Sequence, residues 1–481
     1  MRPEAHPQPF ASARSEDPAG DAADGPDGPG SLLNVVAVSA RRHCRADLMH
    51  ALFGLFEAHQ IRYCVLHSYE SLPEDLPSDL DIALHPDDHS KLLHIIQALQ
   101  ELGYTPVQCV NYEATGFCLI FAWFEDLDLR CLSLDVILEH RQGLLILLSA
   151  ERLLAGRRKR GEFWIPDPAA EFVYLLLKKV LKRELPERQR DRLQSLAGEL
   201  GAARVEALTE PLFGKRPKKL AARCCLDGSL SLHLGRLRRA LWTTMLLRHP
   251  LNPVRHLAAN LQRLVRRWCR PAGYFVALLG PDGAGKSTLA ANLAAQLEDV
   301  FRSSRRHHWR PNLLWRRGGE MAAGPPHERP AHSSVWSTIR LGAYSLDYWL
   351  GYWLRIRPAL ARAGLVIFDR YFEDLLADPA RYRYGGSSGL VRALAQLVPQ
   401  PDFSIVLDAP EDTILLRKQE VAVGEISRQR RVYRELAAGS PAWVRVDASA
   451  GPHELSAHVA RLVVSRLAER FRRRHSRSLH A

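Results

Sequence analysis

The stretch FVALLGPDGAGKSTLA, residues 275–290, decides how the second half of this chain folds. An apolar run leads into a GxxxxGK[ST] motif, and an apolar helical pattern follows it directly. Glycines let backbone N–H groups wrap a phosphate, the lysine brings positive charge to the β- and γ-oxygens, and the serine hydroxyl suits Mg²⁺. The sequence therefore predicts a P-loop that binds ATP through Gly280, Asp282, Gly283, Ala284, Gly285, Lys286, Ser287 and Thr288.

Three further apolar runs, at residues 365–369, 403–408 and 443–448, alternate with helical patterns. Their hydrophobicity is continuous rather than alternating, as is typical of strands buried on both faces of a parallel sheet. The predicted fold class is therefore an α/β P-loop domain with a parallel sheet, over residues 271–467.

The order of the motifs is similar to that of the thymidylate kinase family. The loop PDGAGKST, residues 281–288, resembles the family's xDGxGKST, and IRPALARAGLVIFDRYFED, residues 356–374, resembles its helix, buried strand and Asp-Arg-Tyr. VPQPDFSIVLDAPEDTILLRK, residues 398–418, resembles the family's Pro-Asp strand and the turn after it. RQRRVYREL, residues 428–436, resembles the helix that follows the family's lid.

The resemblance implies a role for each matching residue. Asp369 would support Mg²⁺ together with Ser287. A second reading of Arg370 is a structural salt bridge, and a second reading of Asp282 is a turn or helix cap. The acceptor would be bound by Asp282, Arg370 and Tyr371, and Arg310, which lies outside the matching motifs, is a further candidate to hold an acceptor phosphate. The catalytic residues would be Lys286, Asp369, Arg370 and the lid arginines Arg417, Arg428 and Arg430, with Arg431 a weaker candidate.

The lid arginines are expected to neutralise the transition state, because the P-loop contains no arginine. The alternative is a solvated basic helix face. Two departures from the family's pattern stand out. Ten residues separate Arg417 from Arg428, so the lid is short, and RHHWRPNLLWRRGG, residues 306–319, stands where the family carries Arg-Glu-Pro-Gly-Gly. Tyr344, Tyr348 and Tyr352 recur at helical spacing, which favours a core stripe over a base-stacking one.

Carboxylates also mark the first half of the chain. In YCVLHSYESLPEDLPSDLDIAL, residues 63–84, strand alternation places Asp79 and Asp81 on one face, and Asp135 lies in a later apolar run. Three carboxylates on adjacent strands suit two Mg²⁺ ions. The pattern resembles the nucleotidyltransferase superfamily, although His67 stands at its glycine position; the alternative is a polar strand end with capping aspartates. Lys178 and Lys179 are expected on a solvated face, with contact to phosphate as the alternative.

These signals divide the chain into parts. We expect a disordered tail over residues 1–32, a smaller α+β nucleotidyltransferase-like domain with a helical annex over 46–210, a basic helical linker over 211–270 and a basic tail over 468–481. Within the linker, an apolar stripe from Val254 to Trp268 is expected to pack on a domain, with an acidic membrane surface as the alternative.

The net charge of +13 suits anionic partners. The alternative is that it reflects an arginine-rich composition without a role in binding. Eight cysteines without CxxC spacing favour a reducing, cytoplasmic setting, and no module for specific nucleic-acid binding is indicated. The predicted function is ATP- and Mg²⁺-dependent phosphoryl transfer to a small anionic acceptor. The thymidylate kinase resemblance implies a nucleoside monophosphate as the acceptor. The similarity to fusions associated with bacterial surface-polysaccharide synthesis implies a sugar or sugar phosphate instead. The alternative is an ATP-binding switch or scaffold with degenerate catalytic centres.

Overall fold

The computed structural model describes residues 44–74, 79–113, 116–142, 145–248, 250, 252–314, 330–417 and 423–479. The predicted disordered tail, residues 1–32, lies outside the described residues. Across the described ranges, the search for a helix with the length and apolar character needed to span a membrane finds none.

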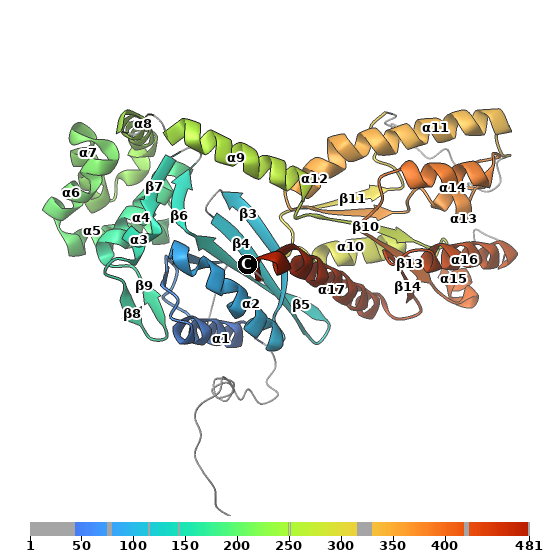
Figure 1. Cartoon of the computed structure of the whole chain (residues 1–481), viewed down its shortest axis with the longest axis horizontal. Coiled ribbons are helices and arrows are strands. Elements are labelled where there is room, and N and C mark those ends of the chain that lie inside the picture. The colour runs from blue at the N-terminus through green and yellow to red at the C-terminus, as the bar shows by residue number, and fades with distance from the viewer. Residues whose placement is uncertain are drawn as a thin grey trace, which may run out of the picture. The chain divides into compact units, whose positions relative to one another are not determined.

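The second half of the chain is built on a five-stranded parallel sheet (Figure 1). Four of its strands are the apolar runs that the sequence predicted, so the α/β expectation is confirmed here. The edge strand Ser304–His308 was not predicted, because its sequence SRRHH is polar and mostly exposed. The strands, in the order that they take across the sheet, are β11 (Ser304–His308), β12 (Leu365–Asp369), β10 (Tyr274–Leu279), β13 (Phe403–Asp408) and β14 (Trp443–Asp447).

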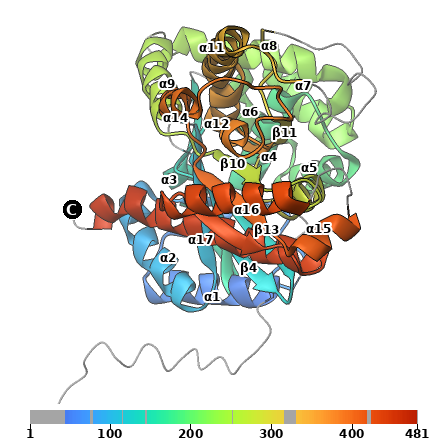
Figure 2. The ribbon, with the colours of Figure 1, turned by 90° about the vertical axis from the view of Figure 1, so that its right-hand side faces the viewer.

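Both faces of this sheet are buried, which explains why its central strands are apolar throughout. Along β10, Val276 and Leu278 belong to one hydrophobic cluster, whereas Phe275, Ala277 and Leu279 belong to another. Alternate side chains of a strand point to opposite faces, so helices must cover both sides. In Figures 1 and 2, α11 and α14 lie on one side of the sheet and α17 on the other. The helices are α10 (Lys286–Gln296), α11 (Ser334–Gly351), the π-helical turn η4 (Tyr352–Ile356), α12 (Arg357–Ala361), α13 (Asp374–Ala377), α14 (Ser388–Leu397), α15 (Glu411–Arg417), α16 (Val423–Ala438) and α17 (Pro452–Leu479).

A mixed sheet forms the centre of the first half. Strands β2 and β5 are parallel, and the other neighbours are antiparallel. The α+β expectation therefore holds, but the edge strand Thr105–Glu113 was not predicted, because polar residues interrupt its apolar ones. The elements are α1 (Arg45–Ala58), η2 (Pro86–Lys91), α2 (Leu92–Glu101) and, in sheet order, β1 (Tyr63–Val65), β2 (Leu80–Leu84), β5 (Asp128–Ile137), β4 (Gly116–Glu125) and β3 (Thr105–Glu113).

Helices follow this sheet and extend past the predicted boundary at residue 210. Helix α6 runs through that position, and α7 and α8 contribute to the same hydrophobic cluster as α4 and α5. The helices from α3 to α8 therefore share one core, and α9 is what remains of the predicted linker. These elements are β6 (Glu139–Gln142), β7 (Leu145–Ser149), α3 (Ala150–Leu154), β8 (Arg158–Arg160), β9 (Phe163–Ile165), α4 (Pro168–Lys182), α5 (Glu187–Leu200), α6 (Ala202–Phe213), α7 (Lys215–Asp227), α8 (Leu230–Arg248) and α9 (Asn252–Cys269).

Two sequence expectations about basic segments differ from the structure. The predicted basic tail begins inside α17, where the half-buried Arg470 donates to the backbone oxygens of Ala272 and Gly273 at 2.6 and 2.7 Å. It therefore binds the chain just before β10 rather than lying in solvent. On α9 the apolar stripe is exposed from Leu257 to Trp268, so its expected packing on a domain is wrong.

Candidate functional site

The loop between β10 and α10 depends on glycine at two positions. Gly280 has a φ of +138°, and a Cβ there would lie 2.5 Å from the backbone oxygen of Leu407. Gly285, directly before α10, has a φ of +92°. Side-chain-bearing residues rarely adopt such angles. These glycines let the backbone turn from the strand into the helix N-terminus, whose N–H groups favour anions.

Lys286 holds this loop from the inside. Its ammonium donates to the backbone oxygens of Gly280 and Pro281 at 2.7 and 2.8 Å. Burial is the main cause that lowers the pKa of Lys286 to about 8, and the charge of Arg370 acts in the same direction. The lysine is still protonated at neutral pH, so a cation lies within the loop that the sequence assigned to phosphate.

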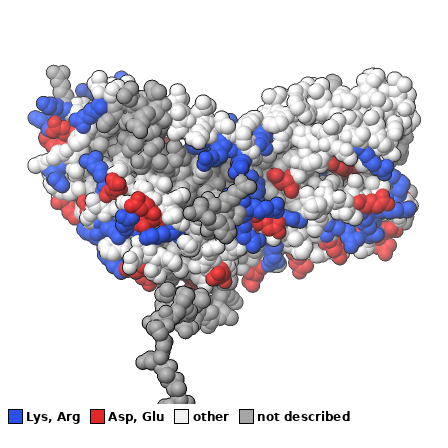
Figure 3. Space-filling model, viewed as in Figure 1, with Lys and Arg blue, Asp and Glu red and all other residues white. Residues whose placement is uncertain are grey.

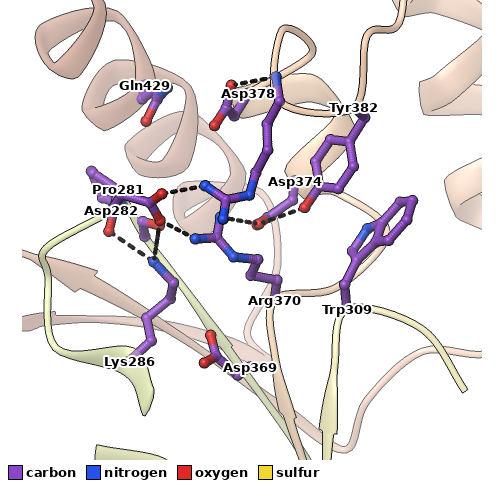
Figure 4. Close-up of polar contacts among 12 residues, drawn as sticks. Pro281, Asp282, Lys286, Trp309, Asp369, Arg370, Asp374, Asp378, Tyr382 and Gln429 are labelled. Carbon is purple, nitrogen blue, oxygen red and sulfur yellow. Dashed lines mark hydrogen bonds and ion pairs between the residues drawn. The ribbon is translucent and has the colours of Figure 1, made fainter. Parts of the chain in front are cut away.

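Asp282 is the anionic centre of the site. It forms ion pairs with Arg370 and Arg381, and the ammonium of Lys286 lies 3.6 Å from its Oδ1 (Figure 4). Burial alone would raise the pKa of Asp282, but these cations outweigh it and hold the pKa well below its usual value. The structure thus makes Asp282 an internal counter-ion that fixes the arginines beside the P-loop.

Arg370 connects the P-loop to the helices beyond β12. Its side chain is 6% exposed, and its Nη1 donates to Asp374 at 3.3 Å. Tyr433 and Tyr382 donate to the same carboxylate at 2.9 and 3.3 Å. The backbone of Arg370 is left-handed, with φ +79°. Such a conformation is uncommon for a side-chain-bearing residue and persists only where its surroundings impose it. The predicted salt bridge of Arg370 exists, and it lies in the site.

Ser287 and Asp369 form the part of the site that fits Mg²⁺. The hydroxyl of Ser287 donates to Oδ2 of Asp369, whereas the buried Oδ1 has no hydrogen-bond partner in the described chain. Burial raises the pKa of Asp369, but hydrogen bonds from His308 and Ser287 and the charge of Lys286 reverse this and lower it to about 2. An ionised carboxylate with an unsatisfied oxygen beside a hydroxyl is a donor set that Mg²⁺ accepts.

Arg310 follows β11 and lies among aromatic rings. Its guanidinium carbon is 4.9 Å from the ring centre of Trp309 and 4.8 Å from that of Tyr344. Nη1 lies 3.8 Å from Asp347, but in the described chain neither Nε nor Nη1 has a hydrogen-bond partner, although both are buried. Trp309 stacks on Tyr382, with ring centres 4.2 Å apart. Buried donors without partners are costly, so they are a feature that a bound anion would satisfy.

Tyr371 does not contact the site in the way that the family pattern suggested. Its ring is buried against Phe275 and Tyr348, and its hydroxyl donates to the backbone oxygen of Pro399. The predicted acceptor-binding role is therefore replaced by a core role. Tyr348 is also core, as the sequence favoured, whereas Tyr344 contacts Trp309 and Arg310.

In the described chain, the partners of the three predicted lid arginines lie outside the P-loop; residues 418–422, between α15 and α16, lie outside the described ranges. Arg417 donates to the backbone oxygen of Ala448 at 3.1 Å, and Arg428 pairs with Glu425. Arg430 donates to Asp408 at 2.8 Å and lies 3.3 Å from Glu411. Arg431 is exposed.

The site contains further residues that no sequence pattern predicted. Arg381 and Tyr382 belong to RYRYGG, residues 381–386, which reads as an ordinary loop, and Asp374 reads as a helix start. The available signal is the arginine–tyrosine alternation shortly after the Asp-Arg-Tyr motif, in a stretch with no apolar period. Because Arg381 and Asp282 are 99 residues apart, their pairing depends on the fold.

Comparisons with known proteins place this site in a family. No protein-family model matches the chain. A thymidylate kinase of Thermomicrobium roseum is 31% identical over 223 residues, which are 42% of this chain and 98% of that protein. Through this domain, the chain belongs to the thymidylate kinase family. Another thymidylate kinase, of Xanthomonas campestris pv. campestris, is 29% identical over 226 residues, 42% of this chain and 88% of its own length. Among solved structures, thymidylate kinase from Ehrlichia chaffeensis matches at 18% identity and TM-score 0.30, covering 40% of this chain and 100% of its own.

Membership of the thymidylate kinase family implies a P-loop kinase domain that uses ATP and Mg²⁺. The predicted kinase family is thus confirmed for this domain, at low identity. The nucleotidyltransferase resemblance of the first half lies beyond these matches and stays a prediction.

Asp81, outside the thymidylate kinase-like domain, is held by a histidine and a lysine. Its Oδ2 lies 2.6 Å from Nε2 of His67 and 3.3 Å from Nζ of Lys178. Lys178 also donates to the hydroxyl of Tyr174. The expectation of a solvated face for Lys178 and Lys179 is wrong, because Lys178 is largely buried at the carboxylates and Lys179 is buried as well.

The other two predicted metal ligands lie close in register. Asp135 on β5 is the Cα partner of Asp81 on the neighbouring parallel strand β2. Asp79 directly precedes β2. Burial, followed by the charge of Asp81, raises the pKa of Asp79. In the described ranges, no group of three acidic, histidine or cysteine side chains has the geometry of a metal site. The ammonium of Lys178 lies on Asp81 where the sequence predicted Mg²⁺; metal binding by these aspartates stays a prediction.

The contacts of Asp81 predict a pH-dependent stability. Burial raises its pKa, but His67 and Lys178 outweigh this and lower it to about 2, from an unfolded value of 3.8. The carboxylate therefore contributes stability above about pH 4, and this is lost as pH falls toward 2. We expect Asp81→Asn to cost about 2 kcal/mol at neutral pH and about half of that at pH 3, measured by urea unfolding. A cost that is the same at both pH values would contradict this pairing.

Proposed function

We propose that the thymidylate kinase-like domain transfers the γ-phosphoryl group of ATP to a small anionic acceptor. The proposal rests chiefly on Arg310, whose buried donors lack hydrogen-bond partners in the described chain beside stacked aromatic rings. Family membership supports the donor side of the reaction, and the acceptor side is argued from the residues.

The donor phosphates would lie in the loop from Gly280 to Thr288. Backbone N–H groups and the α10 N-terminus would face the β- and γ-oxygens, and Lys286 would exchange its bonds to loop carbonyls for bonds to phosphate. Ser287 and Asp369 would hold Mg²⁺. When bound, the ion would supply positive charge that offsets the negative charge of the phosphates.

The transferred group would meet a set of cations that is already positioned. Arg370 and Arg381 are held by Asp282 at the loop, so little reorganisation is needed as charge develops on the phosphoryl oxygens. In this proposal they take the role that the sequence assigned to the lid. Arg417, Arg428 and Arg430 would contribute only through a rearrangement of their present contacts.

The acceptor would carry its own anionic group to Arg310. Hydrogen bonds to Nε and Nη1 would satisfy both donors, and Trp309 and Tyr344, whose rings contact the guanidinium, would line the acceptor site beside it. A nucleoside monophosphate and a sugar phosphate both meet these demands. The relatives are thymidylate kinases, which favours dTMP, whereas Trp309 and Arg310 lie in the segment that replaces the family's Arg-Glu-Pro-Gly-Gly.

An ATP-consumption screen tests this proposal. We expect Mg²⁺-dependent ADP formation to rise at least about tenfold when one member of a panel of dTMP, other nucleoside monophosphates and sugar phosphates is added. If no acceptor changes a slow basal hydrolysis, the proposal fails and the ATP-binding switch becomes the better account.

Arg310→Leu should separate acceptor binding from phosphoryl transfer. We expect KM for the acceptor to rise about 10- to 100-fold, because charge-assisted hydrogen bonds are lost, while KM for ATP stays within about twofold. The matched control is Arg392→Leu, which removes an exposed arginine from α14. An unchanged acceptor KM in Arg310→Leu would remove Arg310 from the acceptor site.

A further inference from the structure

Helix α9 presents its apolar side to solvent. Leu257, Leu261, Leu264 and Val265 are each 54–60% exposed, and Trp268 continues the same stripe. These residues recur at three- and four-residue spacing, so they lie along one face of the helix. In a helix that covers a protein core, such a stripe faces inward. Here it faces outward.

The polar side of α9 makes the contacts with the protein. Arg263 and Arg267 are partly buried, and Nε of Arg267 donates to the backbone oxygen of Ala361 at 2.9 Å. At the end of the helix, Arg357 donates to the backbone oxygens of Trp268 and Cys269. The orientation of α9 is therefore fixed by its arginines, and the exposed stripe is not the result of a detached helix.

A second apolar surface joins the first one. Ile339, Leu346 and Trp349 on α11 are 50–55% exposed, and Trp353 on η4 is exposed too. The ring of Trp353 stacks on Trp268, with centres 6.3 Å apart. In Figure 3 the surface over α11 is white, without charged side chains. We call the exposed apolar residues of α9, α11 and η4 the tryptophan face.

Positive charge gathers where the two parts of this face meet. Burial and then the charges of Arg263, Arg302 and Arg362 lower the pKa of Arg267, so its influential charged neighbours are all arginines. Arg266 and Arg270 are exposed at the same end of α9. Figure 3 shows Lys and Arg side chains gathered where α9 meets α12.

We propose that the tryptophan face docks on an anionic lipid bilayer, with α9 and α11 lying in the plane of the interface. Leucine and tryptophan side chains insert at the boundary between head groups and acyl chains, which is where tryptophan is enriched. The arginines at the end of α9 attract acidic head groups. Both halves of the signal are needed, because an apolar face without charge binds weakly and reversibly. This surface serves attachment and is independent of the proposed phosphoryl transfer.

Vesicle co-sedimentation of the full chain tests the proposal. With vesicles of equal parts phosphatidylcholine and phosphatidylglycerol, we expect binding that high salt weakens, and little binding to phosphatidylcholine alone. Leu261→Ser with Trp349→Ser, one change on each helix, should weaken binding at least about tenfold. Arg266→Glu with Arg270→Glu should do the same. Trp fluorescence should shift to the blue in the wild type upon binding.

The controls separate docking from folding. Leu397→Ser removes an exposed leucine from α14 outside the tryptophan face and should bind like the wild type. ATP affinity and thermal unfolding of every variant should match the wild type. Failure of the wild type to bind acidic vesicles, or equal binding by Leu261→Ser with Trp349→Ser, would overturn the proposal. So would light scattering that shows a dimer in the wild type and a monomer in that variant, because a second copy would then cover the face.

Discussion

Lys286→Met is expected to abolish measurable phosphoryl transfer and to weaken ATP binding about 100-fold or more. Lys286 is the cation inside the loop, with its ammonium on the backbone oxygens of Gly280 and Pro281. Charge-assisted hydrogen bonds to phosphate are worth about 1.5–3 kcal/mol each. Loss of such a donor at the transition state costs a further 10²- to 10³-fold, on the order of what a single oxyanion donor contributes.

The same change should leave the fold without nucleotide nearly as stable as before. Asp282 keeps Arg370 and Arg381, and methionine fills a similar volume, so the free energy of unfolding should change by about 1 kcal/mol or less. Calorimetric ATP titration together with urea unfolding separates the two effects. Lys219→Met, which removes an exposed lysine from α7, is the matched control. Tight ATP binding by Lys286→Met would contradict the assignment of this loop to the phosphates of ATP.

Arg370→Met is expected to abolish transfer as well, but also to destabilise the fold by about 3–5 kcal/mol. Removing one partner of a buried ion pair leaves the other charge uncompensated. Asp374 is fully buried, and without Arg370 it would keep only tyrosine hydroxyls. Burial already raises the pKa of Asp374, and the charge of Arg370 opposes this rise. Without that charge, the pKa of Asp374 should rise further in the variant. A raised carboxyl pKa favours the protonated form, so the destabilisation should shrink as pH falls.

A second substitution separates stability from chemistry. Arg370→Met with Asp374→Asn removes the uncompensated charge, so most of the lost free energy of unfolding should return while transfer stays absent. Arg392→Met serves as the matched arginine control. Recovery of turnover in the double variant would show that Arg370 acts only through stability and has no role at the moving phosphoryl group.

Much of the thymidylate kinase-like domain could be predicted because its signals are local. The strands β10, β12 and β13 are uninterrupted apolar runs, and the P-loop requires glycine and lysine at fixed spacing. The position of Asp369 at a strand end also follows from sequence, because it is the first polar residue after the apolar run of β12.

The remaining features depend on tertiary contacts that no local pattern encodes. Arg381 reaches Asp282 across 99 residues, and Arg470 reaches the backbone before β10 across 197. Tyr371 lies within a motif that suggested acceptor binding, but its hydroxyl is satisfied by a backbone oxygen. Helix α9 is the strongest case. Its periodicity shows an apolar face, whereas the side that packs is fixed by hydrogen bonds of arginines to distant carbonyl oxygens.

Transfer of label from [γ-³²P]ATP tests the central claim most directly. The full chain is incubated with Mg²⁺ and the acceptor that gives the highest turnover, and the products are separated by chromatography. We predict that the label appears in the phosphorylated acceptor in equal amount to the ADP formed, and that Lys286→Met forms neither. Label that appears only as inorganic phosphate, with every acceptor, would contradict the account of this domain as a phosphotransferase.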